Sequence, residues 1–226
     1  MTSRLRPWIG WVVAGFLAAG ASAGGDSGSV DAALKQVSKA TKGVRGIVAD
    51  VEYAETVGKR PIRGSAKLYV SFEGLVRVEV GGDSPRTVIF NSPYLYIHQE
   101  ADHTVEIYDV TFNPHLLGQY ILLGFVPNGK AMKKSFHVEL VKNSTLDGSP
   151  VLSFLMTPKE EAAALAIGRI QLWVDPESGL PAQHKIIHAA GESRLDIRYL
   201  SMSRDDELSP SLFQPRWPAG TKTIPM

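Results

Sequence analysis

The sequence contains no cysteine, and this absence excludes several kinds of site. Without thiols the chain can form no disulfide, hold no Cys-ligated zinc or iron–sulfur cluster, and offer no thiol nucleophile. It also lacks the cysteine on which a bacterial lipoprotein carries its lipid. Charge of one sign is not in excess either, since 24 basic and 23 acidic residues leave a formal charge of +1. Such a balance is not typical of a nucleic-acid-binding protein.

Motifs of catalysis and cofactor binding are missing as well. The chain contains no G-x-S-x-G hydrolase turn, no P-loop and no dinucleotide fingerprint. His184 and His188 are four residues apart, but on a strand this spacing separates them by about 13 Å, too far for one zinc ion. We expect both to be solvated. The sequence therefore predicts no enzyme, no catalytic residue, no metal site and no cofactor.

The N-terminus has the pattern of a secretory signal. Arg4 and Arg6 precede an uncharged, largely apolar run from Pro7 to Gly25, which ends in small residues with Ala21 and Ala23 in an A-x-A arrangement. We expect cleavage after Ala23 and export to a bacterial periplasm, where a cysteine-free protein needs no disulfide. The alternative is an uncleaved membrane anchor. The predicted organisation is a signal peptide (1–23), a linker (24–28) and one domain (29–226).

Most of the remaining chain alternates between apolar and polar residues, as half-buried strands do. About eleven strands are expected, separated by short turns such as Asp147-Gly148 and Asp175 to Gly179. Their ranges are 48–55, 65–72, 75–80, 86–91, 94–99, 104–110, 136–142, 151–156, 167–174, 181–188 and 193–202. So many consecutive antiparallel strands require a strongly curved sheet or a barrel.

Helical spacing occurs in a few segments only. Val30 to Lys42 is amphipathic, with Gly43 or Gly46 at its end. Asn113-Pro114 opens an unusually apolar run, which we expect to form a helical lid. A capping-box pattern from Thr157 to Glu160 predicts a short helix through Leu165. The predicted fold is mainly β (α+β): an incomplete antiparallel β-barrel with a helical lid over an apolar cavity.

Several segments together resemble the LolA-like family of periplasmic outer-membrane lipoprotein carriers and sorting proteins. The first is the early helix followed by the strand to Thr56, and the last is Phe213-Gln214-Pro215 with Pro218-Ala219-Gly220. Between them come segments with the family's order and spacing: Gly64 to Val70, Phe90 to Gln99, Leu155 to Lys159 and Ile170 to Pro181. The combination of Thr157-Pro158-Lys159 with the strand and turn to Pro181 is the most specific.

The resemblance implies a carrier that holds the acyl chains of lipoproteins in an apolar cavity and moves them from the inner toward the outer membrane. It implies an inner-membrane lipoprotein-release transporter as donor, an outer-membrane acceptor such as LolB, and a monomeric carrier. The expected contacts with lipid are apolar side chains on one face of the strands and on the lid. They are Leu68, Val70, Phe72, Val76, Val78, Leu95, Ile97, Leu116, Leu117, Tyr120, Ile121 and Leu172.

One feature of the family is absent, and one alternative remains open. The best-known carriers have an arginine before a proline after the strand that matches Leu68-Tyr69-Val70, and this arginine ties the lid shut. Here Phe72-Glu73 occupies those positions, and Arg77 is the nearest basic residue. The alternative is a lipid or lipoprotein sensor of the RseB type in envelope-stress signalling. Such proteins usually have a second C-terminal domain, whereas this chain ends soon after Trp217.

Overall fold

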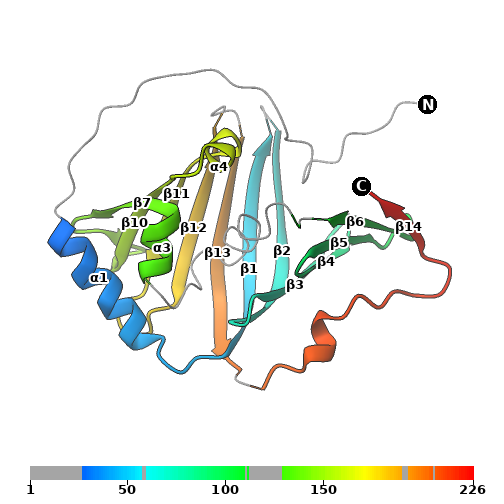
Figure 1. The fold of residues 1–226 in the computed structure, drawn as a ribbon, viewed down its shortest axis with the longest axis horizontal. Helices are drawn as coiled ribbons and strands as arrows, with labels where there is room; N and C mark the ends of the chain where they lie inside the picture. The colour runs from blue at the N-terminus through cyan, green and yellow to red at the C-terminus, as the bar shows by residue number, and fades with distance from the viewer. Residues whose placement is uncertain (1–26, 58–59, 110, 112–128, 190–192, 206) are drawn as a thin grey trace.

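The computed structural model describes residues 27–57, 60–109, 111, 129–189, 193–205 and 207–226. Its main element is a sheet of twelve strands (Figure 1). Six consecutive strands form the first antiparallel series: β1 (Gly46–Val57), β2 (Arg60–Ser71), β3 (Leu75–Val80), β4 (Arg86–Asn91), β5 (Tyr94–Gln99) and β6 (Thr104–Asp109). Polar and apolar residues alternate along most of them, so one face of the sheet is apolar.

A second antiparallel series follows and joins the first. It consists of β7 (Phe136–Val141), β10 (Leu152–Pro158), β11 (Ile167–Val174), β12 (Pro181–His188) and β13 (Ser193–Arg204). β13 pairs with β1 along almost its whole length, so the two series make one continuous sheet. All eleven strands predicted from the alternation are therefore present.

Three strands were not expected. β8 (Thr145–Leu146) and β9 (Ser149–Pro150) form a two-stranded hairpin around the predicted turn at Asp147 and Gly148, both of which have a positive φ. β14 (Lys222–Pro225) pairs with β6 and is the one parallel strand in the described part of the sheet.

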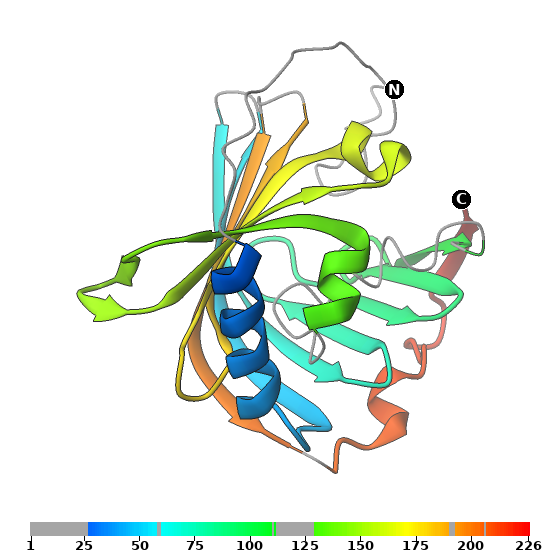
Figure 2. The same cartoon turned by 60° about the vertical axis from the view of Figure 1, so that its left-hand side comes forward.

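The sheet is open and strongly curved (Figure 2). Its edges are β14 and β7, and no pairing among the described residues closes it. The curvature is centred on long strands of 12 residues, β1, β2 and β13. Between β1 and β13 the register shifts at Asp50/Val51, because Leu200 is an extra residue on β13. A bulge of this kind bends a sheet and increases its twist.

Helices occupy a small part of the structure. α1 (Ser27–Ala40) buries the stripe Val30, Ala33, Leu34 and Val37, and the chain turns away at Gly43, which has a φ of 83°. α3 (Gly129–Ser135), next to α1, was not predicted. α4 (Glu161–Ala166) was predicted, but its capping box was not: Thr157 belongs to β10, and the N-cap Glu160 has no side-chain capping bond.

The turn between β11 and β12 holds the C-terminal end of α1. The Asp175 carboxylate accepts hydrogen bonds from the backbone N–H groups of Glu177 and Ser178, at 3.1 and 2.7 Å. Burial raises the pKa of Asp175, but these bonds outweigh it and lower the pKa overall. Gly179, at a φ of 69°, lies so close to α1 that an added Cβ would be 2.9 Å from the Val37 carbonyl oxygen. The turn therefore fixes where α1 lies on the sheet.

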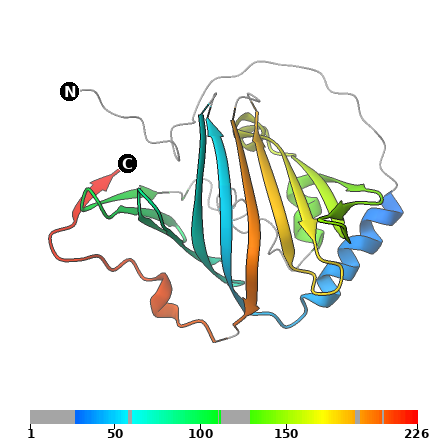
Figure 3. The ribbon, with the colours of Figure 1, turned by 180° about the vertical axis from the view of Figure 1, so that it is seen from behind.

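The C-terminal segment runs alongside β3 to β6 and ends in β14 (Figure 3). It contains a short 3-10 helix, η1 (Pro210–Phe213), and Phe213 is 1% exposed. Its backbone carbonyls accept hydrogen bonds from Arg77 (to Leu212, 3.2 Å) and Asn91 (to Phe213, 3.3 Å). Trp217 stacks on His98 of β5, with 4.8 Å between the ring centroids. We call residues 207–226 the strap; it covers the outer side of β3 to β6.

Candidate functional site: the inner face of the sheet

The face of the sheet opposite the strap carries rows of apolar side chains that run across neighbouring strands. We call it the inner face. Over β1 to β6 two rows follow from the strand register. One is Ala49, Leu68, Val78, Val88 and Ile97; the other is Ile47, Val70, Val76, Phe90 and Leu95. Nearly all of these side chains belong to one buried cluster, against which Val78 packs while partly exposed.

Six of the predicted lipid contacts lie in these two rows, and a seventh lies beside them. Leu68, Val70, Val76, Leu95 and Ile97 are buried, with exposed fractions between 0% and 7%. Val78 and Phe72 are partly buried and pack against the same cluster. The alternation of apolar and polar residues in the sequence predicts that these seven side chains share a face, since residues two apart on a strand point to the same side.

Leu172, the eighth predicted contact on the strands, lies in a different part of the inner face. It is 1% exposed and belongs to a second cluster with Phe154, Ile170 and Ile186. α1 packs on this cluster through its apolar stripe, and α3 through Met132. The structure therefore does not bring Leu172 together with the other seven. The four predicted lid contacts, Leu116, Leu117, Tyr120 and Ile121, lie outside the described residues, as does the signal region with Ala21 and Ala23.

A polar pair lies between the two apolar clusters. A hydrogen bond of 3.1 Å joins Nδ1 of His184 on β12 to the Tyr199 hydroxyl on β13. His184 is 4% exposed and belongs to an inner-face row with Leu172 and Ile197. Burial lowers the pKa of His184 to about 4 and raises that of Tyr199. The imidazole is therefore neutral near pH 7, and the expectation of a solvated His184 was wrong.

Arg77 does not take the place of the family's lid arginine. It pairs in register with Tyr69, on the outer face of the sheet, where its Nε atom lies 2.8 Å from the Glu79 carboxylate. Its guanidinium also donates to the strap, as described above. A side chain on the outer face cannot hold a cover over the inner face.

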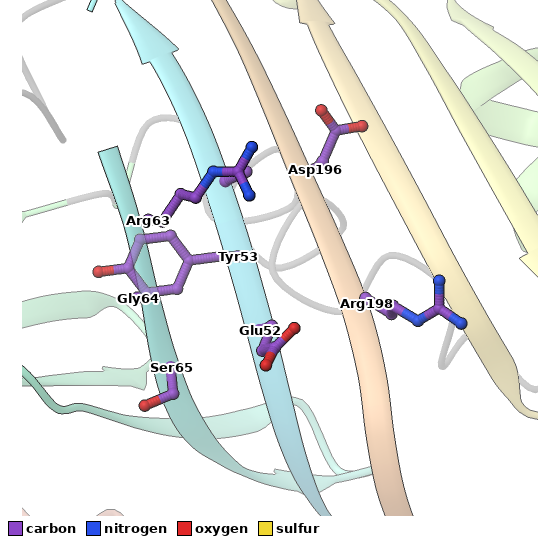
Figure 4. Close-up of a pocket in the computed structure, with 8 residues that line it drawn as sticks. Glu52, Tyr53, Arg63, Gly64, Ser65, Asp196 and Arg198 are labelled. Carbon is purple, nitrogen blue, oxygen red and sulfur yellow. The ribbon is translucent and has the colours of Figure 1, made fainter. Parts of the chain in front are cut away.

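A polar hollow of about 500 Å³ lies over β1, β2 and β13. Figure 4 shows charged side chains around it, among them Glu52, Arg63 and Arg198. None of the predicted lipid contacts lines it. Arg198 also pairs with Asp147 of the β8–β9 hairpin. The hollow lies further along β1 than the two apolar rows, and its lining is charged. A charged lining makes it unsuitable for an acyl chain.

The described residues contain no group of three or more His, Asp or Glu side chains placed to hold a metal ion. None of the helices described is long and apolar enough to cross a membrane.

No protein-family model matches the sequence, and no curated protein matches it. Solved structures do resemble it in fold. An uncharacterized conserved protein from Thermus thermophilus is 12% identical, with a TM-score of 0.56 over 88% of this chain and 99% of that one. Weaker matches include a putative outer membrane lipoprotein-sorting protein domain from Vibrio parahaemolyticus, 8% identical with a TM-score of 0.46 over 81% and 97%. Another is a LolA superfamily protein from Nitrosomonas europaea, 10% identical with a TM-score of 0.45 over 82% and 97%.

The chain shares its fold with the Thermus thermophilus protein. Its largely antiparallel open sheet with short helices is the mainly β architecture that the sequence predicted. At such low identities the likeness concerns the fold, and the role of the inner face has to be argued from its own residues.

Proposed function

We propose that the protein is a periplasmic carrier that binds the acyl chains of lipoproteins on the inner face of β1 to β6. The observation that carries the proposal is the pair of apolar rows across these strands. α1 and α3 pack on the other half of the inner face, and no described helix packs on this one. Each methylene that leaves water contributes about 0.8 kcal/mol, so a wide apolar face suits a long acyl chain.

The proposal includes the route and the partners implied by the sequence resemblance. The carrier takes a lipoprotein from an inner-membrane release transporter and delivers it to an outer-membrane acceptor. Cleavage of the signal after Ala23 frees it in the periplasm, and it acts without a cofactor and without chemistry of its own. A C-terminal antibody applied to the periplasmic fraction checks the cleavage: a full-length band that sediments with membranes would contradict it.

Uptake of a fluorescent fatty acid tests the binding face. Val78→Gln places a polar group in an inner-face row, and we expect its affinity to fall about tenfold, because an apolar ligand leaves the amide without a hydrogen-bond partner. Val48→Gln is the matched control, since Val48 is also a partly buried strand valine but pairs in register with Tyr69 on the outer face. Its affinity should change less than about twofold.

Circular dichroism must show both variants folded for the comparison to hold. An equal loss of uptake in the two variants would contradict the proposed face, and a wild-type protein that takes up no fatty acid would contradict acyl binding altogether. A similar test applies to the expected lid: Leu117→Glu or Ile121→Glu should abolish uptake and leave the sheet folded.

A further inference from the structure

Basic side chains gather on the exposed sides of α1 and α3. Lys35, Lys39 and Lys42 are exposed and follow each other at intervals of four and three residues. At 100° per residue Asp31, Lys35 and Lys39 share one stripe of α1, opposite the buried stripe, and Lys42 lies in the turn just after the helix. From Asp31 to Lys39 this stripe is about 12 Å long at 1.5 Å per residue.

α3 extends this basic surface beside the first turn of α1. The Nζ atom of Lys133 lies 2.7 Å from the Asp31 carboxylate, so the two helices are neighbours at this point (Figure 2). Lys134 is exposed next to it. Lys159 also lies here, because its Nζ atom donates a 2.6 Å hydrogen bond to the Lys133 carbonyl. We call these six lysines, 35, 39, 42, 133, 134 and 159, the lysine face.

This gathering of charge is not a reflection of composition. The whole chain has one more basic than acidic residue, whereas the lysine face has six cations. Asp31 is the one acid of α1, and it is already paired with Lys133; Glu160 adjoins Lys159 at the margin. Lys39 and Lys42 lie at the negative end of the α1 dipole, and Lys133 and Lys134 lie in the last turn of α3, but the helix dipole does not account for Lys35 in the middle of α1. Like charges at four-residue spacing destabilise an isolated helix.

We propose that the lysine face docks the protein on the anionic surface of a phospholipid bilayer. Lysine ammonium groups on long flexible stems attract a diffuse layer of phosphate headgroups without a shaped pocket. A protein partner is less suitable, because protein interfaces are depleted in lysine and depend on buried aromatic or apolar anchors. On the exposed stripe the lysines alternate only with small or polar residues such as Ala32 and Gln36. The inference rests on the proposed function in one respect: a carrier of acyl chains must approach a membrane.

Co-sedimentation of the exported protein with vesicles tests the docking. We expect it to bind vesicles that contain phosphatidylglycerol and phosphatidylcholine in low salt, and to dissociate near 1 M salt, where charges are screened beyond about 3 Å. Vesicles of phosphatidylcholine alone measure any binding that does not depend on anionic headgroups, and this binding is subtracted.

Two triple variants with the same change in net charge give the decisive comparison. Lys35→Gln, Lys39→Gln and Lys42→Gln together should weaken binding to phosphatidylglycerol vesicles at least about tenfold, since each lysine near an anionic surface contributes about fivefold. The control replaces exposed Lys67, Lys142 and Lys222, which lie on strands or a strand end, and should change binding less than about threefold. Glutamine is a good helix former, so α1 is retained.

The outcomes separate this inference from the acyl-carrier proposal. Equal losses in both triple variants, or absent phosphatidylglycerol binding by the wild type, would overturn docking through the lysine face. Binding to soluble polyglutamate but not to vesicles would overturn docking on a membrane and would favour an acidic protein as the partner. Fatty-acid uptake should be the same in the α1 triple variant and in the wild type. A wild-type protein that takes up no fatty acid would contradict the acyl-carrier proposal but not docking through the lysine face.

Discussion

At the scale of single residues, the buried His184 makes stability depend on pH. Burial holds its pKa at about 4, below its ordinary value of 6.5, so the unfolded chain binds a proton more readily than the folded one. The stabilising contribution is complete above pH 6.5 and is lost as the pH falls toward 4. The full shift corresponds to about 3 kcal/mol.

Replacement of this histidine by a non-titrating residue should reduce the pH dependence. We expect His184→Gln to lose up to about 3 kcal/mol less than the wild type between pH 7.5 and pH 4, because glutamine binds no proton. Urea unfolding at several pH values measures this difference. His98, whose pKa is also lowered by burial, is present in both proteins and cancels. Parallel curves for the two proteins would contradict a neutral, buried His184.

The sequence predicts which side chains share the inner face, but not how these side chains are divided between its two apolar clusters. The period of two places Leu68 and Val78 on one face whatever the tertiary structure. That Leu172 lies under α1 depends on which strands pair across β1 and β13, and no local pattern contains this information. His184 was misjudged for the same reason: its neighbours Leu172, Ile197 and Tyr199 are on other strands.

At the scale of elements, the β11–β12 turn predicts a specific weakness at Gly179. Its positive φ disfavours any Cβ by about 1–2 kcal/mol, and the added carbon would also meet the Val37 carbonyl and the Ala40 side chain within 3 Å. Since α1 cannot move away without uncovering its apolar stripe, we expect Gly179→Ala to cost about 3 kcal/mol or more.

Gly148 provides a matched control for this prediction. It has a φ of 83° at a hairpin turn, but nothing lies within 4 Å of an added Cβ. Gly148→Ala should therefore show the backbone cost alone, about 1–2 kcal/mol. Chemical denaturation of both variants gives the comparison; equal losses would show that the contact of the turn with α1 contributes nothing.

The strands and α1 were predictable because their signals are local, whereas the shortest elements depend on distant partners. η1 has a local signal in Ser209-Pro210, where the serine hydroxyl accepts from the Ser211 N–H and proline takes the first turn. β14 has none, since its pairing with β6 is a contact between segments more than a hundred residues apart. The capping box failed because β10 continues through Thr157 to Pro158.

At the scale of the whole molecule, the sheet is covered on different sides in its two halves. α1 and α3 pack on the inner face of the second series, and the strap packs on the outer face of β3 to β6. β4 reflects this in its sequence, because Thr87, Val88, Ile89 and Phe90 are all buried. Such a continuous buried run indicates a strand with both faces covered. The strap thus lies on the opposite side of β3 to β6 from the apolar rows proposed to bind the ligand.

The strap should stabilise its half of the molecule more than the other. Phe213 is almost fully buried on the outer side, so Phe213→Ala should cost about 3–5 kcal/mol, whereas the exposed Gln214→Ala should cost less than about 0.5 kcal/mol. Because the two halves have separate apolar clusters joined through β1 and β13, the loss of hydrogen-exchange protection should be concentrated in β3 to β6. Equal loss in β10 to β12 would show that the sheet opens as one cooperative unit, and unchanged protection in β3 to β6 would show that the strap does not hold them.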